Sequence, residues 1–462
     1  MSNKISRLAN GRPAAPVKIV HLGIGNFTRA HQIWYTEKAA DAAEWGVAAF
    51  TGRSPKMADT LNAQDGVYTL MIRQAAGDEY EVISAISAAH AADDEAALID
   101  YFKSPELAII TSTVTEAGYC RGGDGHIDKS RPDVKADIAT LREKGDAPLN
   151  TAPARIVNGL DARRAAGAGP IAIMPCDNLP ENGRAFRAVC EDLAYEVDPS
   201  LLDWMQTNVS WVTTMVDRIT PATTDEDREA VEANCGYVDA SPVPTEPFSE
   251  WVICGYFPKG RPAWEGAGAQ FADDVVPHEQ RKLWMLNGSH SLMAYAATIM
   301  GIETVYDGIT DPQVRGWVDE WWDVAAKHLP LPAEEVQAYR DALVSRFENP
   351  RIRHLLKQIA MDGSQKIPVR ILPALRLDRQ QGLLPVGPIR AVAAWILHLR
   401  GYGAPVNDVR GDEMVELAKG DLAGAIDRVL GAIGPDLLSD KELTAEIKRV
   451  AEELEAIAVV KP

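Results

Sequence analysis

Three side chains suited to alcohol chemistry lie within nine residues of one another: Lys282, Asn287 and His290. At 100° per residue of an α-helix, Asn287 lies about 140° and His290 about 80° from Lys282, so one broad face holds all three. Oxidising an alcohol requires a base for the hydroxyl proton and donors for the developing alkoxide. The segment therefore predicts Lys282 as the base, Asn287 as an amide donor and His290 as an orienting or proton-assisting group.

The same segment also fits a purely structural role, in which a lone histidine lines the core and a lone lysine points to water. Gly288 weighs slightly against that alternative, because glycine inside a helix costs stability. We therefore expect a close neighbour that needs the space at Gly288.

A glycine turn near the N-terminus predicts a dinucleotide site. Residues 23–28 (Gly-Ile-Gly-Asn-Phe-Thr) stand between a predicted strand at 17–22 and a predicted helix at 27–43. The first glycine of such a turn makes the bend, and the second lets the backbone approach a pyrophosphate at the helix N-terminus. Thr28 replaces the third glycine of the usual pattern. Two glycines also occur in turns for steric reasons alone, but the strand–turn–helix–strand context favours a cofactor. The contacts predicted here are Gly23, Gly25, Asn26 and Phe27.

The second strand, predicted at residues 46–50, should be followed by the residue that reads the adenosine ribose. The next residues are Thr51, Gly52 and Arg53, with no acid among them. Arg53 fits three roles: pairing with a 2′-phosphate, stacking on adenine, or lying solvated at the surface. We predict NAD as the cofactor, and NADP stays open.

Polar residues also follow two later strands. Asp177 and Asn178 come after a strand predicted at 170–174, and Asp217 follows one predicted at 208–216. Ligands of open α/β sheets bind at the carboxyl ends of strands, which favours a site role. The alternative is that these residues form turns and caps.

The fold class predicted is α/β, with a Rossmann-type N-terminal domain and a mostly α-helical C-terminal domain. A chain of 462 residues exceeds the roughly 250–300 residues that one core usually serves. Strands alternate with helices at first, and from Pro277 the pattern is mainly helical. We therefore expect a dinucleotide-binding domain over residues 1–275 and a helical substrate-binding and catalytic domain over 276–462. Other expected elements are strands at 68–72, 81–86, 108–113 and 250–254, and helices at 152–166, 278–300, 333–347 and 353–360.

The composition excludes several other classes of protein. A net charge of −19 disfavours nucleic acid and anionic membranes as partners. The five cysteines never form a C-x-x-C spacing, which argues against a disulfide framework and a structural zinc site. The sequence has no run of about 18 apolar residues and no secretory signal. We expect a cytoplasmic protein that binds small molecules and no metal.

Seven spaced motifs resemble the polyol-specific long-chain dehydrogenase/reductase family, which includes mannitol 2-dehydrogenase, D-arabinitol 4-dehydrogenase and fructuronate reductase. The resemblance covers most of the chain, and seven motifs in the right order are far more specific than any one of them. The motifs are residues 23–31, 64–69, 113–116, 176–179, 216–221, 282–290 and 362–368.

The resemblance implies a role for each matching residue of a zinc-independent, monomeric enzyme. Lys282 is implied as the catalytic base, with Asn178 and Asn287 holding the reacting oxygen and His290 orienting the substrate. Asp217 and Lys366 are implied to face the substrate, and Arg370 is a further candidate for that role. Implied cofactor contacts after another strand are Thr113, Val114 and Thr115.

Three functions stay open at this stage. The first is oxidation of a neutral polyol such as mannitol to fructose, and the second is the mannonate/fructuronate reaction of a sugar acid. Some relatives carry an arginine where this chain has Gln358, which favours a neutral polyol, although Lys366 and Arg370 offer charge for an acid. The third is a nucleotide-binding regulatory protein without turnover, which leaves the joint presence of the four catalytic candidates unexplained.

Overall fold

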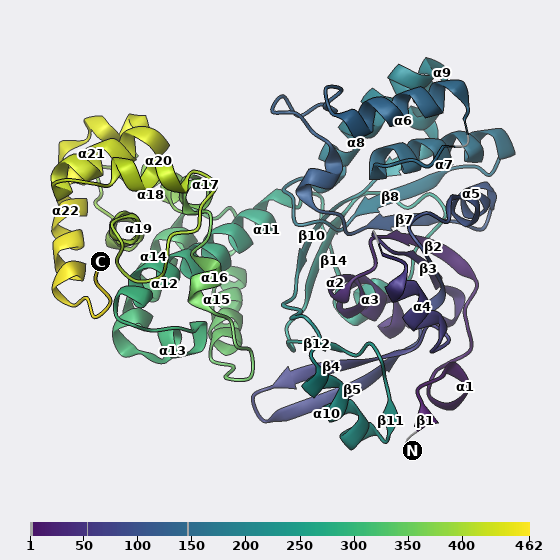
Figure 1. Ribbon diagram of the computed structural model, residues 1–462, viewed down its shortest axis with the longest axis horizontal. Helices are drawn as coiled ribbons and strands as arrows, with labels where there is room; N and C mark the ends of the chain where they lie inside the picture. The colour runs from purple at the N-terminus through teal and green to yellow at the C-terminus, as the bar shows by residue number, and fades with distance from the viewer. Residues whose placement is uncertain (1–2, 53, 146) are drawn as a thin grey trace. The chain divides into compact units, whose positions relative to one another are not determined.

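The computed structural model describes residues 3–52, 54–145 and 147–462, and the chain divides into two compact units, Met1–Val276 and Pro277–Pro462. Figure 1 shows strands and helices together in the first, the N-terminal unit, and helices in the second, the C-terminal unit. The boundary expected from the sequence lies one residue before this division.

A six-stranded parallel sheet with the order β6-β3-β2-β7-β8-β9 forms the centre of the N-terminal unit. Its strands are short and apolar, as strands covered on both faces must be. The strand order reverses between β2 and β7, which makes the crevice at their carboxyl ends the usual place for a ligand. This topology confirms the Rossmann-type prediction. The bounds are β2 Val17–Leu22, β3 Gly46–Phe50, β6 Ile86–His90, β7 Ile109–Ser112, β8 Ile171–Pro175 and β9 Val209–Trp211.

Helices cover both faces of this sheet, as Figure 1 shows. Side chains alternate along β2, so that Val20 and Leu22 join the apolar core under α5 to α9, while Ile19 joins the core on the other face. That second core includes residues of α3, α4 and strand β13. The bounds are α2 Asn26–Ala30, α3 Gln32–Lys38, α4 Lys56–Asn62, α5 Glu95–Lys103, α6 Pro132–Glu143, α7 Ala152–Ala166, α8 Asn182–Val197, α9 Pro199–Asn208 and α10 Asp225–Cys235.

Smaller sheets complete the N-terminal unit. One has the order β12-β4-β5, another β10-β13-β14, and β1 pairs with β11. Strand β10 runs antiparallel to β13, with Asp217 opposite Glu250. The bounds are β1 Asn3–Lys4, β4 Tyr68–Gln74, β5 Gly77–Ile83, β10 Thr213–Asp217, β11 Tyr237–Val238, β12 Val243–Thr245, β13 Glu250–Cys254 and β14 Gln270–Phe271.

Three predicted elements of this unit are wrong as single elements. The strand predicted at 208–216 consists of β9 and β10, which belong to different sheets and are separated at Val212. The helix predicted at 27–43 breaks at His31, where φ is −121° and ψ is −95°, and it ends at Lys38. The strand predicted at 81–86 is also divided, between the end of β5 and the start of β6.

The C-terminal unit packs its helices around α12 and α19, which are buried over nearly their whole length. The predicted helix at 278–300 is divided into α11, a π-helical segment called η4, and α12. The helix predicted at 353–360 is shorter, because only Leu356–Ile359 is helical. The bounds are α11 Val276–Arg281, η4 Lys282–Gly288, α12 Ser289–Ile299, α13 Val305–Thr310, α14 Pro312–Lys327, α15 Ala333–Phe347, α16 Leu356–Ile359, α17 Gly363–Arg370, α18 Leu372–Gln380, α19 Val386–Leu399, α20 Gly411–Leu417, α21 Leu422–Ile433 and α22 Lys441–Ala456.

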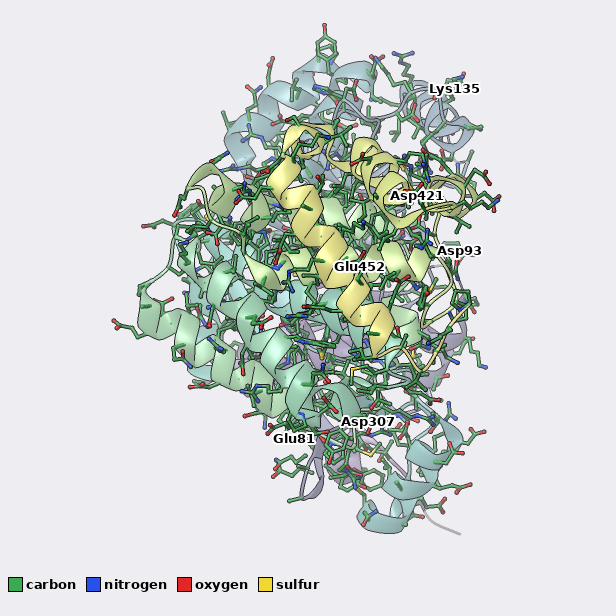
Figure 2. All side chains as sticks on the ribbon, turned by 90° about the vertical axis from the view of Figure 1, so that its left-hand side faces the viewer. Glu81, Asp93, Lys135, Asp307, Asp421 and Glu452 are labelled. Carbon is green, nitrogen blue, oxygen red and sulfur yellow. The ribbon has the colours of Figure 1, made fainter. Side chains whose placement is uncertain are left out.

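Acidic side chains are exposed on helices of the C-terminal unit, in keeping with the net charge of −19. Figure 2 labels Asp307 on α13, Asp421 at the start of α21 and Glu452 on α22, all exposed. Among the described helices, none has both the length and the apolar character that a membrane span requires.

Candidate active site

The turn after β2 lies where the strand order of the large sheet reverses. Gly23 has φ of +99°, and a Cβ atom there would stand 2.4 Å from the carbonyl oxygen of Thr113. The N–H groups of Gly23 and Ile24 both donate to the Phe50 carbonyl, at 3.0 and 2.9 Å. Gly23 is therefore required by the backbone itself, because no other residue fits both the left-handed φ and the close approach.

Gly25 is different, because the protein leaves space beside it. It stands at the N-cap of α2 with an extended φ of −141°, and an added Cβ would meet nothing closer than the Gly23 carbonyl oxygen at 4.0 Å. No protein atom demands glycine here. The open space at the start of a helix fits the phosphate of a dinucleotide, which needs close access to backbone N–H groups.

A buried network of polar side chains contacts this turn. His21 lies 2.7 Å from the Thr111 hydroxyl through Nδ1 and 3.0 Å from the Thr113 hydroxyl through Nε2. The Thr28 hydroxyl lies 2.9 Å from His21 Nε2 and 2.6 Å from Thr113 Oγ1. Burial lowers the pKa of His21 to about 3, so the network stays uncharged. Thr28 stands at the place of the third glycine, and its hydroxyl joins the turn to Thr113, the residue after β7. Sequence reasoning missed His21, although a histidine inside an apolar strand was a usable signal.

The structure narrows the part that Asn26 plays in cofactor binding. Its Nδ2 donates to the Pro221 carbonyl at 2.9 Å and to the Thr223 hydroxyl at 3.2 Å, and its Oδ1 accepts from Arg29 at 2.7 Å. The side chain is therefore committed to the protein, and only the backbone N–H stays for a ligand. Phe27 is half-buried and stacks on His31. Arg53 lies outside the described residues.

The segment 113–115 after β7 is held by the buried carboxylate of Asp177. Asp177 accepts from the Val114 N–H at 2.5 Å, the Ser112 hydroxyl at 3.0 Å and the Tyr119 hydroxyl at 2.6 Å. Burial raises the pKa of Asp177 to about 7, against these three hydrogen bonds, which lower it. Asp177 therefore orders the predicted cofactor contacts Val114 and its neighbours, rather than binding the substrate.

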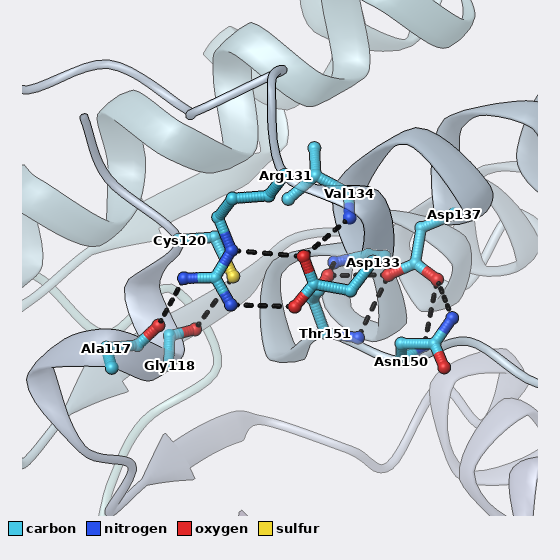
Figure 3. Close-up of polar contacts among 10 residues, drawn as sticks. Ala117, Gly118, Cys120, Arg131, Asp133, Val134, Asp137, Asn150 and Thr151 are labelled. Carbon is cyan, nitrogen blue, oxygen red and sulfur yellow. Dashed lines mark hydrogen bonds and ion pairs between the residues drawn. The ribbon is translucent and has the colours of Figure 1, made fainter.

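A second set of polar contacts, shown in Figure 3, holds the turn that follows this segment. Arg131 donates to the Ala117 carbonyl at 3.2 Å and pairs with Asp133 at 2.7 Å. Asp137 accepts from the hydroxyl of Thr151, the N-cap of α7, at 2.7 Å, and from Asn150 at 2.8 Å. These bonds tie α6 and α7 to the loop beside the predicted cofactor site.

Two further predicted residues belong to the N-terminal unit. Asn178 follows β8 and is exposed, whereas Asp217 is buried at the end of β10. Asn178 thus stands at a carboxyl edge of the large sheet, as expected for a ligand contact. Asp217 lies in a different sheet, on strand β10, which runs antiparallel to β13.

The predicted base lies in the π-helical segment η4 of the C-terminal unit. Its hydrogen bonds join residues five apart, so Lys282 and Asn287 stand one turn apart on the same face. Both are half-buried. The sequence-based expectation that Lys282 and Asn287 lie about 140° apart on an α-helix is therefore wrong. The π-helix places the two side chains at a smaller angle to each other around the helix axis. Single turns of π-helix occur frequently at functional sites.

Two buried tryptophans of α14 hold η4. Trp321 Nε1 donates to the Trp284 carbonyl and Trp322 Nε1 donates to the Met285 carbonyl, each at 2.9 Å. A Cβ atom on Gly288 would stand 2.5 Å from the Trp321 ring. The neighbour expected at Gly288 is therefore Trp321.

His290 is buried in α12, two residues after the end of η4. Its ring lies 4.9 Å from that of Phe347 and 5.0 Å, edge to face, from that of His354. Its Nε2 has no hydrogen-bond partner in the described part of the chain. Burial lowers the pKa of His290 well below its usual value, and the positive charges of His354, Arg346 and Arg370 lower it further. His290 is therefore a neutral imidazole with a buried Nε2 that has no partner among the described residues.

Helix α17 brings Arg370 to the same place. Its Nη1 donates to the Asn287 carbonyl at 3.4 Å and to the Ser291 hydroxyl at 3.2 Å. Lys366, one turn earlier, donates to the carbonyls of Ile359 and Met361. The C-terminal unit thus brings Asn287 and Arg370 into contact, with Lys366 on the same helix. Within the described residues, no group of three or more His, Cys, Asp or Glu side chains is arranged to hold a metal ion.

The open space at Gly25 leads to a test of the cofactor turn. We expect Gly25→Ala to weaken NADH binding about tenfold or more, because the methyl group would occupy the room that a pyrophosphate needs. The midpoint of thermal unfolding should not change, since the methyl group meets no close protein atom. Fluorescence titration with NADH and a thermal melt measure the two quantities.

The matched control is Gly123→Ala, where an added Cβ has nothing within 4 Å. It should change neither quantity. If Gly25→Ala bound NADH as tightly as the unaltered protein, the pyrophosphate would not lie beside Gly25.

Two family models match the chain, one over each unit. The family model "Mannitol dehydrogenase Rossmann domain" matches residues 17–266, and "Mannitol dehydrogenase C-terminal domain" matches residues 274–458. D-mannonate oxidoreductase of Escherichia coli is 37% identical over 402 residues, which cover 85% of this chain and 82% of that protein. Mannitol 2-dehydrogenase of Cereibacter sphaeroides is 34% identical over 409 residues, which cover 87% and 84%.

Among solved structures, the chain is similar to Pseudomonas fluorescens mannitol 2-dehydrogenase in its ternary complex with NAD and D-mannitol. The TM-score is 0.77 at 33% identity, and the match covers 95% of this chain and 92% of that one. The similarity therefore extends through both units.

Proposed function

We propose a hydride-transfer function for this chain, which belongs to the mannitol dehydrogenase family. The hydride passes between NAD and a carbon of an open-chain polyol or its ketose, as in a mannitol 2-dehydrogenase. The observation that carries the proposal is η4, which sets the amine of Lys282 and the amide of Asn287 on one face. An amine and an amide in that relation are what alcohol oxidation needs from a protein.

When bound, NAD takes up the hydride that leaves the carbinol carbon. The residues that fit NAD are Gly23 and Gly25 with the first N–H groups of α2, Phe27, and the segment 113–115. The space at Gly25 is the structural reason for this assignment. NADP stays an alternative cofactor, because the acid that usually reads the ribose is absent after β3.

The protein's own groups handle the proton and the oxygen. Lys282 Nζ accepts the hydroxyl proton while the C–H electron pair leaves, so the alcohol becomes a ketone, and in reduction Lys282 returns that proton. The amides of Asn178 and Asn287 donate to the oxygen as negative charge develops on it. We assign His290 Nε2 and Asp217 to the substrate's other hydroxyl groups.

The test is a reduction assay with purified protein. Oxidation of NADH and of NADPH is followed by absorbance with fructose, fructuronate, tagaturonate, xylulose and ribulose. Reduction of at least one ketose with a matching cofactor supports the proposal. No turnover with either cofactor would instead favour a nucleotide-binding regulatory protein.

A zinc-independent mechanism predicts that chelators do not inhibit. Lys282 supplies the base, so no metal-bound water is needed to activate the alcohol. Prolonged dialysis against EDTA should leave kcat unchanged. Loss of activity that zinc restores would contradict a lysine-only mechanism.

A further inference from the structure

We propose that Lys366 and Arg370 form a carboxylate-binding subsite, so that the preferred substrate is an open-chain sugar acid rather than a neutral polyol. The inference rests on the proposed hydride transfer and specifies its substrate class. It follows from two cations of α17 that form no ion pair with any carboxylate among the described residues.

Arg370 is the stronger of the two observations. Only Nη1 of its guanidinium has hydrogen-bond partners in the described chain, namely the carbonyl of Asn287 and the hydroxyl of Ser291. Burial lowers the pKa of Arg370 to about 10. A half-buried charge that is not paired is costly, and the remaining N–H donors form the planar fork that matches a carboxylate.

Four other arginines of the C-terminal unit show how a carboxylate compensates such a charge. Each of the four forms an ion pair at 2.6–2.9 Å, whereas Arg400 and Arg428 donate to backbone carbonyls. Arg370 takes part in no such pair within the described residues. The pairs are Arg340–Asp323, Arg376–Asp436, Arg379–Asp440 and Arg390–Glu320.

Lys366 adds a second positive charge on the same face. Residues four apart on a helix are neighbours, and Arg370 is the largest charged influence on Lys366, lowering its pKa after burial itself. Lys366 Nζ donates only to backbone carbonyls in the described chain. An anion between the two cations would relieve their repulsion.

The nearby acids are already occupied. Asp408 accepts from the N–H of Ser364 at 2.7 Å and from its hydroxyl at 2.5 Å. Asp362 accepts from the Val409 N–H at 3.2 Å. Neither carboxylate forms an ion pair with Lys366 or Arg370 in the part of the chain that the structure describes. We therefore expect a bound anion to compensate the charge of these two cations.

The position of Arg370 relates this anion to the reacting carbon. Arg370 bonds to the backbone of Asn287, whose side chain is assigned to the reacting oxygen. A carboxylate bound by Arg370 would therefore lie beside the residue that is assigned to the reacting oxygen. Gln358 is neutral, so the positive charge comes from α17.

The experiment compares D-mannitol with D-mannonate, which differ by a carboxylate in place of one hydroxymethyl group, as substrates for oxidation by NAD and by NADP. We expect kcat/KM to be about 100-fold higher for mannonate. In Arg370→Met, the ratio of the two kcat/KM values should fall about 100-fold, and Lys366→Met should lower it about tenfold. The ratio cancels losses that both substrates share. Arg376→Met, which breaks an exposed ion pair, should leave the ratio unchanged.

The outcomes separate the two proposals. Equal or better oxidation of mannitol by the unaltered protein overturns the carboxylate subsite and leaves hydride transfer standing. A preference for fructose 6-phosphate over fructuronate in the reverse direction also overturns it, since the anion would then be a phosphate. If NADH binds and neither substrate class reacts, the proposed function itself fails.

Discussion

Replacing Lys282 by alanine is expected to lower kcat about 1000-fold without weakening the binding of NADH. The amine is the proton acceptor in the proposed step, and no other lysine occurs in η4. Cofactor binding should be unaffected, because the residues that fit NAD belong to the N-terminal unit. Steady-state oxidation of the preferred substrate measures kcat, and fluorescence titration measures NADH affinity.

Chemical rescue distinguishes a lost base from a damaged fold. A small primary amine such as propylamine should restore part of the rate in Lys282→Ala, because it supplies the missing base in the space left by the side chain. Lys357→Ala is the control, since Lys357 is an exposed lysine of α16. Near-normal turnover by Lys282→Ala would remove Lys282 from the role of base.

Local signals explain which elements could be predicted from the sequence. Helix α7 has the expected bounds because the Thr151 side chain caps its start and Gly167, with φ of +62°, ends it. The glycine turn after β2 could be predicted for the same reason, since its requirements are local. The role of Thr28 could not, because it depends on Thr113, far along the chain.

The site of the C-terminal unit shows more clearly which features the sequence pattern cannot predict. Lys282, Asn287 and His290 were predicted as a group, but on an α-helix. The π-helix depends on hydrogen bonds from Trp321 and Trp322 to carbonyls 37 positions earlier. The apolar pattern of residues 278–300 does not indicate that Trp321 and Trp322, far along the chain, bond to this segment.

The wrong prediction of one strand at 208–216 also results from contacts between residues far apart in the sequence. Residues 208–216 form one stretch rich in β-branched and apolar side chains, yet β9 and β10 join different sheets. A run of that kind reports burial, and only the pairing partners decide where one strand ends and the next begins. His354, which packs edge to face against His290, likewise gave no signal from its own neighbours in sequence.

The second large effect is expected for Gly288→Ala, which should lower both stability and kcat. The added Cβ would stand 2.5 Å from the Trp321 ring, closer than carbon atoms approach. Moving that ring should cost about 1–3 kcal/mol of unfolding free energy. It would also displace the indole that donates to the Trp284 carbonyl, so the π-helical turn should relax and Lys282 and Asn287 should separate. We expect kcat to fall about 100-fold, because a misplacement of about 1 Å costs that much.

Gly316→Ala is the matched control, because it adds the same methyl group to α14, the helix of Trp321, with no atom within 4 Å. It should stabilise the protein by about 0.5–1 kcal/mol, as alanine does in place of a helical glycine, and leave kcat unchanged. Urea unfolding gives the free energies and steady-state assays give the rates. A Gly288→Ala protein that lost stability but kept its kcat would show that the packing of Trp321 supports the fold alone. Loss of kcat at a temperature where the variant is fully folded would instead connect that packing to the geometry of Lys282 and Asn287.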